Sequence, residues 1–461
     1  MTSLPLPDLI CATGGTAAIM GERAITAGLT TDSRRVVPGC VFLALSGERF
    51  DGNTFAAEAT RKGAAAVVVS RTEGEYAPGA TVILVQDTLK ALQSLASWWR
   101  EQLDPLHVVG LTGSSGKTST KDMTLAVLAQ RYKAIATAGN LNNHIGVPLS
   151  ILATEKGTEA AVWEMGMNHA GELDPLCRMT RPQIGIITTI GSAHLEFLGS
   201  RQNIAQEKCT VARSLPKEGY MIYPATDDFA DYSASQTVAT PIPVGGCDSP
   251  VRALNCRTTA QGTAYDLHIA GLGETRINLP VPGQHMVSNS LLAAAAGWKL
   301  GCTLEQIAAG LSSATLTKGR LACKQVEGYT VVDDTYNANP ESMKAALRTV
   351  AALEGPKRRF AVLGKMGELG EGGIAAHAEI GWCAASLGYA AVVVVGEECA
   401  ETDALCQAAA ETIPAVLVNT PAEAAATLRS MTEPGDAILF KGSRSAGMER
   451  TMYELFPSLK N

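Results

Sequence analysis

The sequence lacks the segments that would direct a protein into or across a membrane. Asp8 interrupts the opening stretch and the first basic residue is Arg23, so no charged region is followed by an apolar one. The longest apolar runs, such as Ala390 to Val395, are far shorter than the ~20 residues that a membrane-spanning helix needs. We therefore expect a soluble protein located in the cytoplasm.

The sequence also lacks closely spaced cysteine pairs and an excess of positive charge. The 11 cysteines are scattered and never spaced as Cys-x-x-Cys, which argues against a disulfide scaffold or a zinc site and suits a reducing compartment. With 38 Lys and Arg against 45 Asp and Glu, the net charge is −7, so no general attraction to nucleic acid is expected. Any strongly anionic ligand must be bound by a local group of residues.

The length and composition are those of a folded protein with several domains. Hydrophobic residues make up 46% and charged residues 18% of the 461 residues. At roughly 150 residues per domain, this length predicts about three domains. We place them at residues 1–103, 104–314 and 315–461, with a polar hinge at 312–319 between the last two.

Apolar segments alternate with helical ones through most of the chain. Strands are expected at 106–111, 160–163 and 184–190, and short alternating runs at 253–279 indicate antiparallel hairpins. In the last third, strands at 330–332, 360–363, 390–395, 415–418 and 437–440 alternate with helices at 340–353, 376–387, 400–412 and 421–431. This pattern predicts an α/β protein with a central parallel-sheet ATPase domain of the P-loop type and a C-terminal, Rossmann-like, doubly wound domain.

A glycine-rich loop follows the strand at 106–111 and leads into a helix. It reads Thr112-Gly113-Ser114-Ser115-Gly116-Lys117-Thr118-Ser119. Glycines let such a loop turn its N–H groups inward at a helix N-terminus, which suits a triphosphate. Lys117 would contact the β- and γ-phosphates, and the Thr118 hydroxyl would bind Mg²⁺. Leu111 stands where the usual pattern has glycine, so the loop is a variant; the alternative is a glycine-serine turn with an exposed lysine.

Three further polar residues follow predicted secondary structure. Glu164 ends the strand at 160–163, His194 follows the strand at 184–190, and Lys208 comes directly after Glu207. A carboxylate at the carboxyl end of a parallel strand can hold Mg²⁺ in the same crevice as a phosphate loop. The alternatives are a helix-capping or solvated acid for Glu164, a structural histidine for His194, and a solvated helix pair for Lys208.

Several motifs, taken in their order along the chain, resemble those of the Mur ligases. They lie at 112–118 (TGSSGKT), 139–148 (GNLNNHIGVP), 164–169 (EMGMNH), 191–196 (GSAHLE), 207–208 (EK), 282–285 (PGQH), 319–321 (GRL) and 333–340 (DDTYNANP). The resemblance extends over nearly the whole chain. It implies an ATP-dependent amide ligase of peptidoglycan precursor synthesis, and the later motifs resemble the branch that joins D-alanyl-D-alanine to UDP-N-acetylmuramoyl-tripeptide.

The resemblance also implies a mechanism and the residues that carry it. The tripeptide carboxylate would attack the γ-phosphoryl group of ATP to give an acyl phosphate, from which the dipeptide amine then displaces phosphate. Two Mg²⁺ ions would assist, one on Thr118 and Glu164 and a second on His194 and a carbamate formed on Lys208. Lys117, His194 and Lys208 are the implied catalytic residues. The implied ATP contacts, besides the loop residues 113–119, are Asn289, Arg320, Asp334, Tyr336 and Asn337.

Substrate contacts are implied in all three predicted domains. The residues concerned are Ser33, Arg34, Ser46 and Gly47 for the UDP-sugar, Asn140 and Asn143 in the central domain, and Lys441 and Arg444 for the carboxylate of the dipeptide. A solvated basic turn is the competing interpretation of Lys441 and Arg444. Lys365 departs from the family pattern, since relatives usually carry Asp at this position.

Two other functions share parts of this pattern. A sister ligase that adds a single amino acid, of the Mur or folylpolyglutamate type, would use the same ATP chemistry. A P-loop NTPase acting as an interaction module is the other, but a GTPase switch would need Asn-Lys-x-Asp and the chain has no Asn-Lys pair. We expect a monomer without a nucleic-acid partner, open when free and closed on ATP and substrate.

Overall fold

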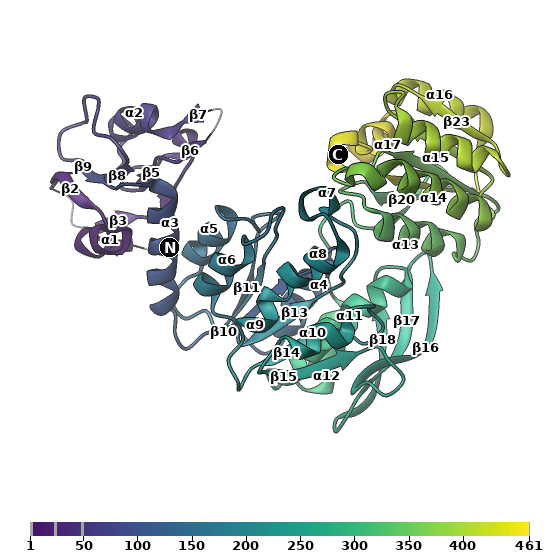
Figure 1. Ribbon diagram of the computed structural model, residues 1–461, viewed down its shortest axis with the longest axis horizontal. Helices are drawn as coiled ribbons and strands as arrows, with labels where there is room; N and C mark the ends of the chain where they lie inside the picture. The colour runs from purple at the N-terminus through teal and green to yellow at the C-terminus, as the bar shows by residue number, and fades with distance from the viewer. Residues whose placement is uncertain (1–2, 23–24, 48–49, 461) are drawn as a thin grey trace. The chain divides into compact units, whose positions relative to one another are not determined.

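The computed structural model describes residues 3–22, 25–47 and 50–460 (Figure 1). The chain divides into two compact units. Unit 1 comprises Met1–Val108, Lys133–Met165 and Asp174–Pro182, and unit 2 comprises Val109–Tyr132, Gly166–Leu173 and Gln183–Asn461. The predicted boundaries at 103 and 314 stay a prediction.

Unit 1 is built on a mostly parallel sheet with the strand order β2-β9-β8-β5-β4. The strands are β2 (Thr16–Ile19), β9 (Thr81–Leu84), β8 (Ala66–Val69), β5 (Val41–Leu43) and β4 (Leu29–Thr30). The β2–β9 pair is antiparallel and the other pairs are parallel. Phe42, Val67 and Val82 of these strands pack with Ala56 and Ala59 of helix α2 in one buried cluster.

Smaller elements complete unit 1. They are the antiparallel pairs β1 (Ser3–Pro5) with β3 (Ile25–Ala27) and β6 (Ser46–Gly47) with β7 (Phe50–Asp51), the helices α1 (Leu6–Thr13), α2 (Ala56–Arg61) and α3 (Thr88–Glu101), the parallel pair β11 (Ala134–Ala136) with β12 (Ala160–Glu164), and the helices α5 (Gly146–Ala153) and α6 (Leu173–Thr180), the last of which begins in unit 2. All five residues of β12 are buried, which explains why its sequence is almost entirely apolar until Glu164.

The first part of unit 2 continues from a parallel sheet into antiparallel hairpins. Strands β10 (His107–Thr112), β13 (Ile184–Ile187), β14 (Tyr220–Pro224) and β15 (Thr240–Val244) are parallel neighbours, and β16 (Val251–Thr259), β17 (Gly262–Ile269) and β18 (Gly273–Leu279) follow as an antiparallel edge. The predicted hairpins at 253–279 are thus confirmed. The helices here are α4 (Lys117–Leu128), α7 (Leu195–Leu198), α8 (Arg201–Lys208), α9 (Thr210–Arg213), α10 (Ala230–Ser235), α11 (Gln284–Lys299) and α12 (Leu304–Ser312).

The second part of unit 2 is a six-stranded sheet with the order β19-β20-β24-β21-β22-β23. Its strands are β19 (Ala322–Val326), β20 (Tyr329–Asp334), β21 (Arg359–Gly364), β22 (Ala391–Val395), β23 (Ala415–Val418) and β24 (Ala437–Lys441); all pairs except β19–β20 are parallel. Helices α16 (Pro421–Met431) and α17 (Glu449–Leu455) cover one face, and α13 (Pro340–Ala351), α14 (Gly373–Ser386) and α15 (Ala400–Ala410) pack on one another in a second layer (Figure 1).

The alternation of strands and helices in the last third agrees closely with the sequence-based expectation. Each of the five predicted strands and four predicted helices forms, with ends shifted by a few residues at most. Among the described residues, no helix combines the length and apolarity needed to cross a bilayer. The alternation of strands and helices around mainly parallel sheets confirms the α/β class.

Candidate active site

The glycine-rich loop lies between β10 and α4 and has the backbone that the sequence predicts. Gly113 and Gly116 have φ values of +155° and +83°, which a residue with a side chain rarely adopts. Their neighbours also leave no room: a Cβ on Gly116 would lie 2.5 Å from Asn289 Oδ1, and one on Gly113 would collide with Thr188 Oγ1. Both glycines are thus required by backbone shape and by close packing.

Hydrogen bonds from the segment after β13 fix this loop. Ser114 N donates to Thr189 O at 2.9 Å, and Ser115 N donates to Thr189 Oγ1 at 3.2 Å. Ser114 Oγ accepts a hydrogen bond of 2.9 Å from Gly191 N. The predicted strand at 184–190 ends early, at Ile187, because its last residues bind the phosphate loop instead of extending the sheet.

Lys117 and Thr118 begin α4, whose N-terminal end supplies the positive end of a helix dipole. Lys117 Nζ donates to Gly113 O at 2.7 Å, so the ammonium lies over the loop. Thr118 Oγ1 accepts a hydrogen bond of 2.9 Å from Arg320 Nη2. Ser119 is buried just behind them. The arrangement concentrates positive charge where a phosphate chain would lie.

Arg320 comes from the segment that leads into the second sheet of unit 2. Its guanidinium lies over the Tyr336 ring, 4.3 Å from the ring centroid, and its buried Nε has no hydrogen-bond partner among the described residues. Thr317, in the predicted hinge, donates from its N and Oγ1 to Asp122 Oδ2 of α4 at 2.8 and 2.9 Å. The structure therefore brings the predicted ATP-binding residues Arg320 and Tyr336 together with the loop.

Asp334 and Lys441 form a buried ion pair at the carboxyl ends of β20 and β24. Lys441 Nζ lies 2.6 Å from Asp334 Oδ2, and their side chains are 3% and 14% exposed. Lys441 also donates to Asn337 O at 2.9 Å, and Asp334 Oδ1 accepts from Leu321 N at 3.1 Å. Lys441 thus ties together the strand ends that carry Tyr336. Arg444, by contrast, is exposed and pairs with Glu449 Oε1 at 3.0 Å.

His194 lies at the start of α7 with φ +67°, and its Nδ1 is 2.6 Å from Glu368 Oε2. The imidazole lowers the pKa of the Glu368 carboxyl, although the buried Nδ1 has no partner of hydrogen-bond geometry among the described residues. Glu341, in the first turn of α13, accepts from Ser192 N and Ser192 Oγ, both at 2.9 Å. Two carboxylates that follow the hinge therefore hold the loop that carries His194.

Lys208 ends α8 and is buried to 1% exposure. Burial, and next the charge of Lys117, lower its pKa well below the ordinary lysine value. Glu207 beside it accepts from Gly171 N and Leu173 N at 2.9 and 3.0 Å. A buried lysine with a lowered pKa is a good nucleophile toward CO₂, because more of it is the neutral amine.

Glu164, in unit 1, is a buried carboxylate with an unfilled acceptor. Asn142 Nδ2 donates to Glu164 Oε1 at 2.8 Å, while the buried Oε2 has no hydrogen-bond partner among the described residues. No group of three or more His, Cys, Asp or Glu side chains suited to a metal is found in residues 3–22, 25–47 and 50–460. Mg²⁺ usually combines one or two protein oxygens with phosphates and water, so Glu164 and the Thr118 hydroxyl each fit as single ligands.

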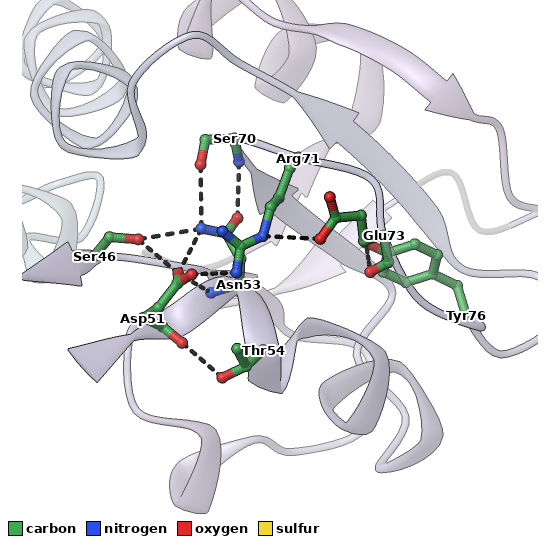
Figure 2. Close-up of polar contacts among 8 residues, drawn as sticks. All are labelled: Ser46, Asp51, Asn53, Thr54, Ser70, Arg71, Glu73 and Tyr76. Atoms are coloured by element: carbon green, nitrogen blue, oxygen red, sulfur yellow. Dashed lines mark hydrogen bonds and ion pairs between the residues drawn. The ribbon is translucent and has the colours of Figure 1, made fainter.

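The predicted substrate residues Ser46 and Gly47 lie beside a network of polar contacts in unit 1. Asp51 Oδ1 accepts from Ser46 Oγ and Asn53 Nδ2 at 2.8 Å each, and Arg71 pairs with the other oxygen of Asp51 (Figure 2). Hydrogen bonds from Asn53 and then Ser46 lower the pKa of Asp51 to about 2. Ser46 and Gly47 form β6 at the edge of this network, whereas the next two residues, Glu48 and Arg49, lie outside the described residues.

The remaining candidates in unit 1 are exposed or cap local turns. Arg34 is exposed and pairs with Asp32, which it brings to a pKa of about 2, and the neighbouring Ser33 begins a short 3₁₀ turn. Asn143 Oδ1 accepts from Gly146 N at 2.8 Å at the start of α5, and Asn140 is exposed. Their roles in substrate binding stay predictions.

Sequence reasoning missed four residues that contact the site. Glu341, Glu368, Asn142 and Asp122 were not selected because a lone acid or amide carries no signal without its partner. Asn339 precedes the helix predicted at 340–353. It does cap α13, and its Nδ2 also donates to Ser114 O of the phosphate loop at 3.2 Å.

Comparison with known proteins places these features in one family. Residues 26–100 match the family model described as Mur ligase family, catalytic domain, residues 111–297 the Mur ligase middle domain, and residues 319–444 the Mur ligase, glutamate ligase domain. A UDP-N-acetylmuramoyl-tripeptide–D-alanyl-D-alanine ligase of Escherichia coli K12 is 40% identical over 376 residues, covering 80% of this chain and 81% of that protein.

Solved structures give the same result. MurF from Acinetobacter baumannii superposes with a TM-score of 0.90 at 34% identity, covering 99% of both chains. MurF ligase from Thermotoga maritima, in complex with ADP, has a TM-score of 0.83 at 28% identity over 94% of this chain and 98% of that one.

The fold and the loop define a nucleotide-binding α/β enzyme in which the segment before a second sheet supplies an arginine to the phosphate loop. The chain belongs to the Mur ligase family, whose members are ATP-dependent amide ligases. The resemblance recognised in the sequence is thereby confirmed.

Proposed function

We propose that the protein joins D-alanyl-D-alanine to UDP-N-acetylmuramoyl-tripeptide in peptidoglycan precursor synthesis, at the cost of ATP. Two proteins of that name are 40% identical to this chain over 376 residues and 36% identical over 444 residues, the second match covering 95% of this chain. The observation that best supports the proposal is the hydrogen bond from Arg320 to Thr118, because it brings a cation from beyond the predicted hinge to the glycine-rich loop.

The chemistry must bring two anions together. The tripeptide carboxylate attacks the γ-phosphorus, the bond to the β,γ-bridging oxygen breaks, and ADP leaves with that electron pair. The dipeptide amine then attacks the acyl carbon, loses a proton, and expels inorganic phosphate. Lys117, Arg320 and the N–H groups at the start of α4 offset the charge on the phosphates during the first step.

Mg²⁺ would stabilise the negative charge that builds up on the phosphoryl oxygens. We propose Thr118 and Glu164 as protein ligands of one ion, and His194 with a carbamate on Lys208 as ligands of a second. The unfilled Oε2 of Glu164 supports the first assignment, and the buried Lys208 with its lowered pKa supports the second. The carbamate would turn a cation that burial disfavours into an anionic oxygen ligand.

The other site assignments are part of the same proposal. Asn289, Asp334, Tyr336 and Asn337 would form the rest of the nucleotide site. In unit 1, the half-buried Ser33 and the exposed Arg34, Ser46, Gly47, Asn140 and Asn143 would contact the UDP-tripeptide. Arg444 is exposed and available to a carboxylate, whereas Lys441 is already paired with Asp334. We also propose three domains divided near residues 103 and 314.

We propose a monomeric cytoplasmic enzyme. All 11 cysteines are unpaired, which suits a reducing compartment. Light scattering of the purified protein tests the oligomeric state, and fractionation of cells tests the location.

The test of function is an amide-formation assay. The protein is incubated with ATP, Mg²⁺ and the UDP-tripeptide, and either D-alanyl-D-alanine or a single amino acid is added. We expect a UDP-pentapeptide, ADP and phosphate only with the dipeptide. Amide formation with the single amino acid would point to a sister ligase, and ATP hydrolysis without any amide would point to an NTPase module.

A further inference from the structure

Asn339 joins two parts of unit 2 through the two ends of its side-chain amide. Its Oδ1 accepts from Ser342 N at 2.9 Å and so caps α13, while its Nδ2 donates to Ser114 O of the phosphate loop at 3.2 Å. The residue is only 8% exposed. The partners establish which end is which, because Ser342 N can only donate and Ser114 O can only accept. Each end of the amide therefore has its own role.

The cap by itself does not require asparagine. Asn, Asp and Ser are about equally good at the residue before a helix, since each offers an oxygen to the first turn. Elsewhere in this chain Thr303 and Thr420 cap α12 and α16 with a hydroxyl. Aspartate has no donor, and serine has one oxygen for both purposes, whereas asparagine presents an acceptor and a donor on separate atoms. The hydrogen bond to the phosphate loop, rather than the cap, explains the amide at position 339.

The chain just before Asn339 is the segment 334–337, which carries three of the proposed nucleotide contacts. Lys441 Nζ donates to Asn337 O at 2.9 Å, which fixes this segment to the end of β24. Two residues later, Asn339 fixes the same stretch of chain to Ser114 of the phosphate loop. The contact between Asn339 and Ser114 therefore sets the spacing between the phosphate loop and the groups expected to bind the rest of the nucleotide.

We propose that Asn339 is a positioning residue for ATP: its Nδ2 holds the phosphate loop at the spacing from the segment 334–337 that one nucleotide bridges. The inference rests on the nucleotide site of the proposed function. A site that is held in its binding geometry binds more tightly, because less freedom is lost when the ligand arrives. The loss of one neutral hydrogen bond is expected to weaken ADP binding about 3- to 10-fold.

Asn339→Ser is the direct test, because it keeps the cap and removes the amide donor. Its urea midpoint should stay near that of the parent, while its dissociation constant for ADP with Mg²⁺, measured by calorimetry, should rise about 3- to 10-fold. In amide formation the KM for ATP should rise by a similar factor, whereas kcat and the KM for D-alanyl-D-alanine should change little. Asn339→Asp should bind ADP more weakly still, because two acceptors then face each other.

Thr420→Ala is the matched control, since it removes a cap and leaves the phosphate loop untouched. Thr420 Oγ1 accepts from Glu423 N at the start of α16, and no hydrogen bond joins Thr420 to the phosphate loop within the described part of the chain. The urea midpoint of Thr420→Ala should fall, while its ADP binding should match that of the parent. The two variants are thus expected to show opposite patterns of stability and affinity.

ADP binding in Asn339→Ser as tight as in the parent would overturn the proposal, whatever happens to stability. So would a fall in kcat with an unchanged KM for ATP, since the residue would then act on a step after binding. A parent protein that binds no ADP would overturn both this inference and the proposed nucleotide site. If the parent binds ADP but forms no amide with the dipeptide, the proposed function fails, while the comparison of ADP affinities still decides the role of Asn339.

Discussion

Replacing Lys441 by methionine should destabilise the second sheet of unit 2. The change keeps the length of the side chain but removes the charge 2.6 Å from Asp334 Oδ2 and the hydrogen bond of 2.9 Å to Asn337 O. Because the two side chains are only 3% and 14% exposed, the loss leaves a nearly buried carboxylate without its partner. Such a loss typically costs about 3–5 kcal/mol, against about 0–1 kcal/mol for an exposed pair.

The assay is urea unfolding of the parent, Lys441→Met, Asp334→Asn and the double variant. The double variant should be more stable than Lys441→Met alone, since no charge is then left unpaired. The affinity for ADP should fall in Lys441→Met, because the strand ends that carry Tyr336 lose their tie, while the KM for D-alanyl-D-alanine should change little. A loss of stability below about 1 kcal/mol, with a large rise in that KM, would refute the reasoning and favour a direct contact with the dipeptide.

Three further outcomes are expected. Gly116→Ala should weaken ADP binding at least about tenfold, or by about 1.4 kcal/mol, whereas Gly271→Ala, at nearly the same φ but with nothing within 4 Å, should not; equal binding in both would contradict the packing argument. Lys365 lowers the pKa of Glu401 from 4.5 to about 2, so this carboxylate stabilises the fold above about pH 4.5 and the gain disappears as the pH falls toward 2. Thermal unfolding of Glu401→Gln should show a shallower loss over that range than the parent, and identical curves would be evidence against the pair. Lys208→Ala should form no amide until a small carboxylate is added, and full activity without it would exclude the carbamate.

Much of the fold could be predicted because its signals are local. The alternation of apolar and helical segments places the parallel strands of the last third and three strands of the central sheet, β10, β12 and β13, and the glycines at 113 and 116 mark the phosphate loop before any contact is known. Strands β11, β14 and β15 were not predicted, and one predicted strand ends too late. The strand predicted to reach residue 190 stops at Ile187, since Thr189 binds the loop. The spacing of apolar residues is the same for a residue that extends a strand and for one that hydrogen-bonds a neighbouring loop.

The candidate site was predictable where a motif is contiguous and not where it joins distant residues. Lys117, Thr118 and Arg320 were selected from their motifs, and the structure brings them together. The pairing of Glu368 with His194 could not be anticipated, because each is an ordinary residue until the fold makes them neighbours. Likewise, nothing in the local sequence around Lys441 shows that its charge is used up by Asp334.

The transfer of oxygen from the peptide to phosphate tests the central claim most directly. The C-terminal carboxylate of the UDP-tripeptide is labelled with ¹⁸O, and the phosphate released during amide formation is examined by mass spectrometry. Activation as an acyl phosphate predicts one labelled oxygen in each phosphate, because the carboxylate oxygen stays on phosphorus when the amine attacks carbon. Amide formation that releases only unlabelled phosphate would contradict it.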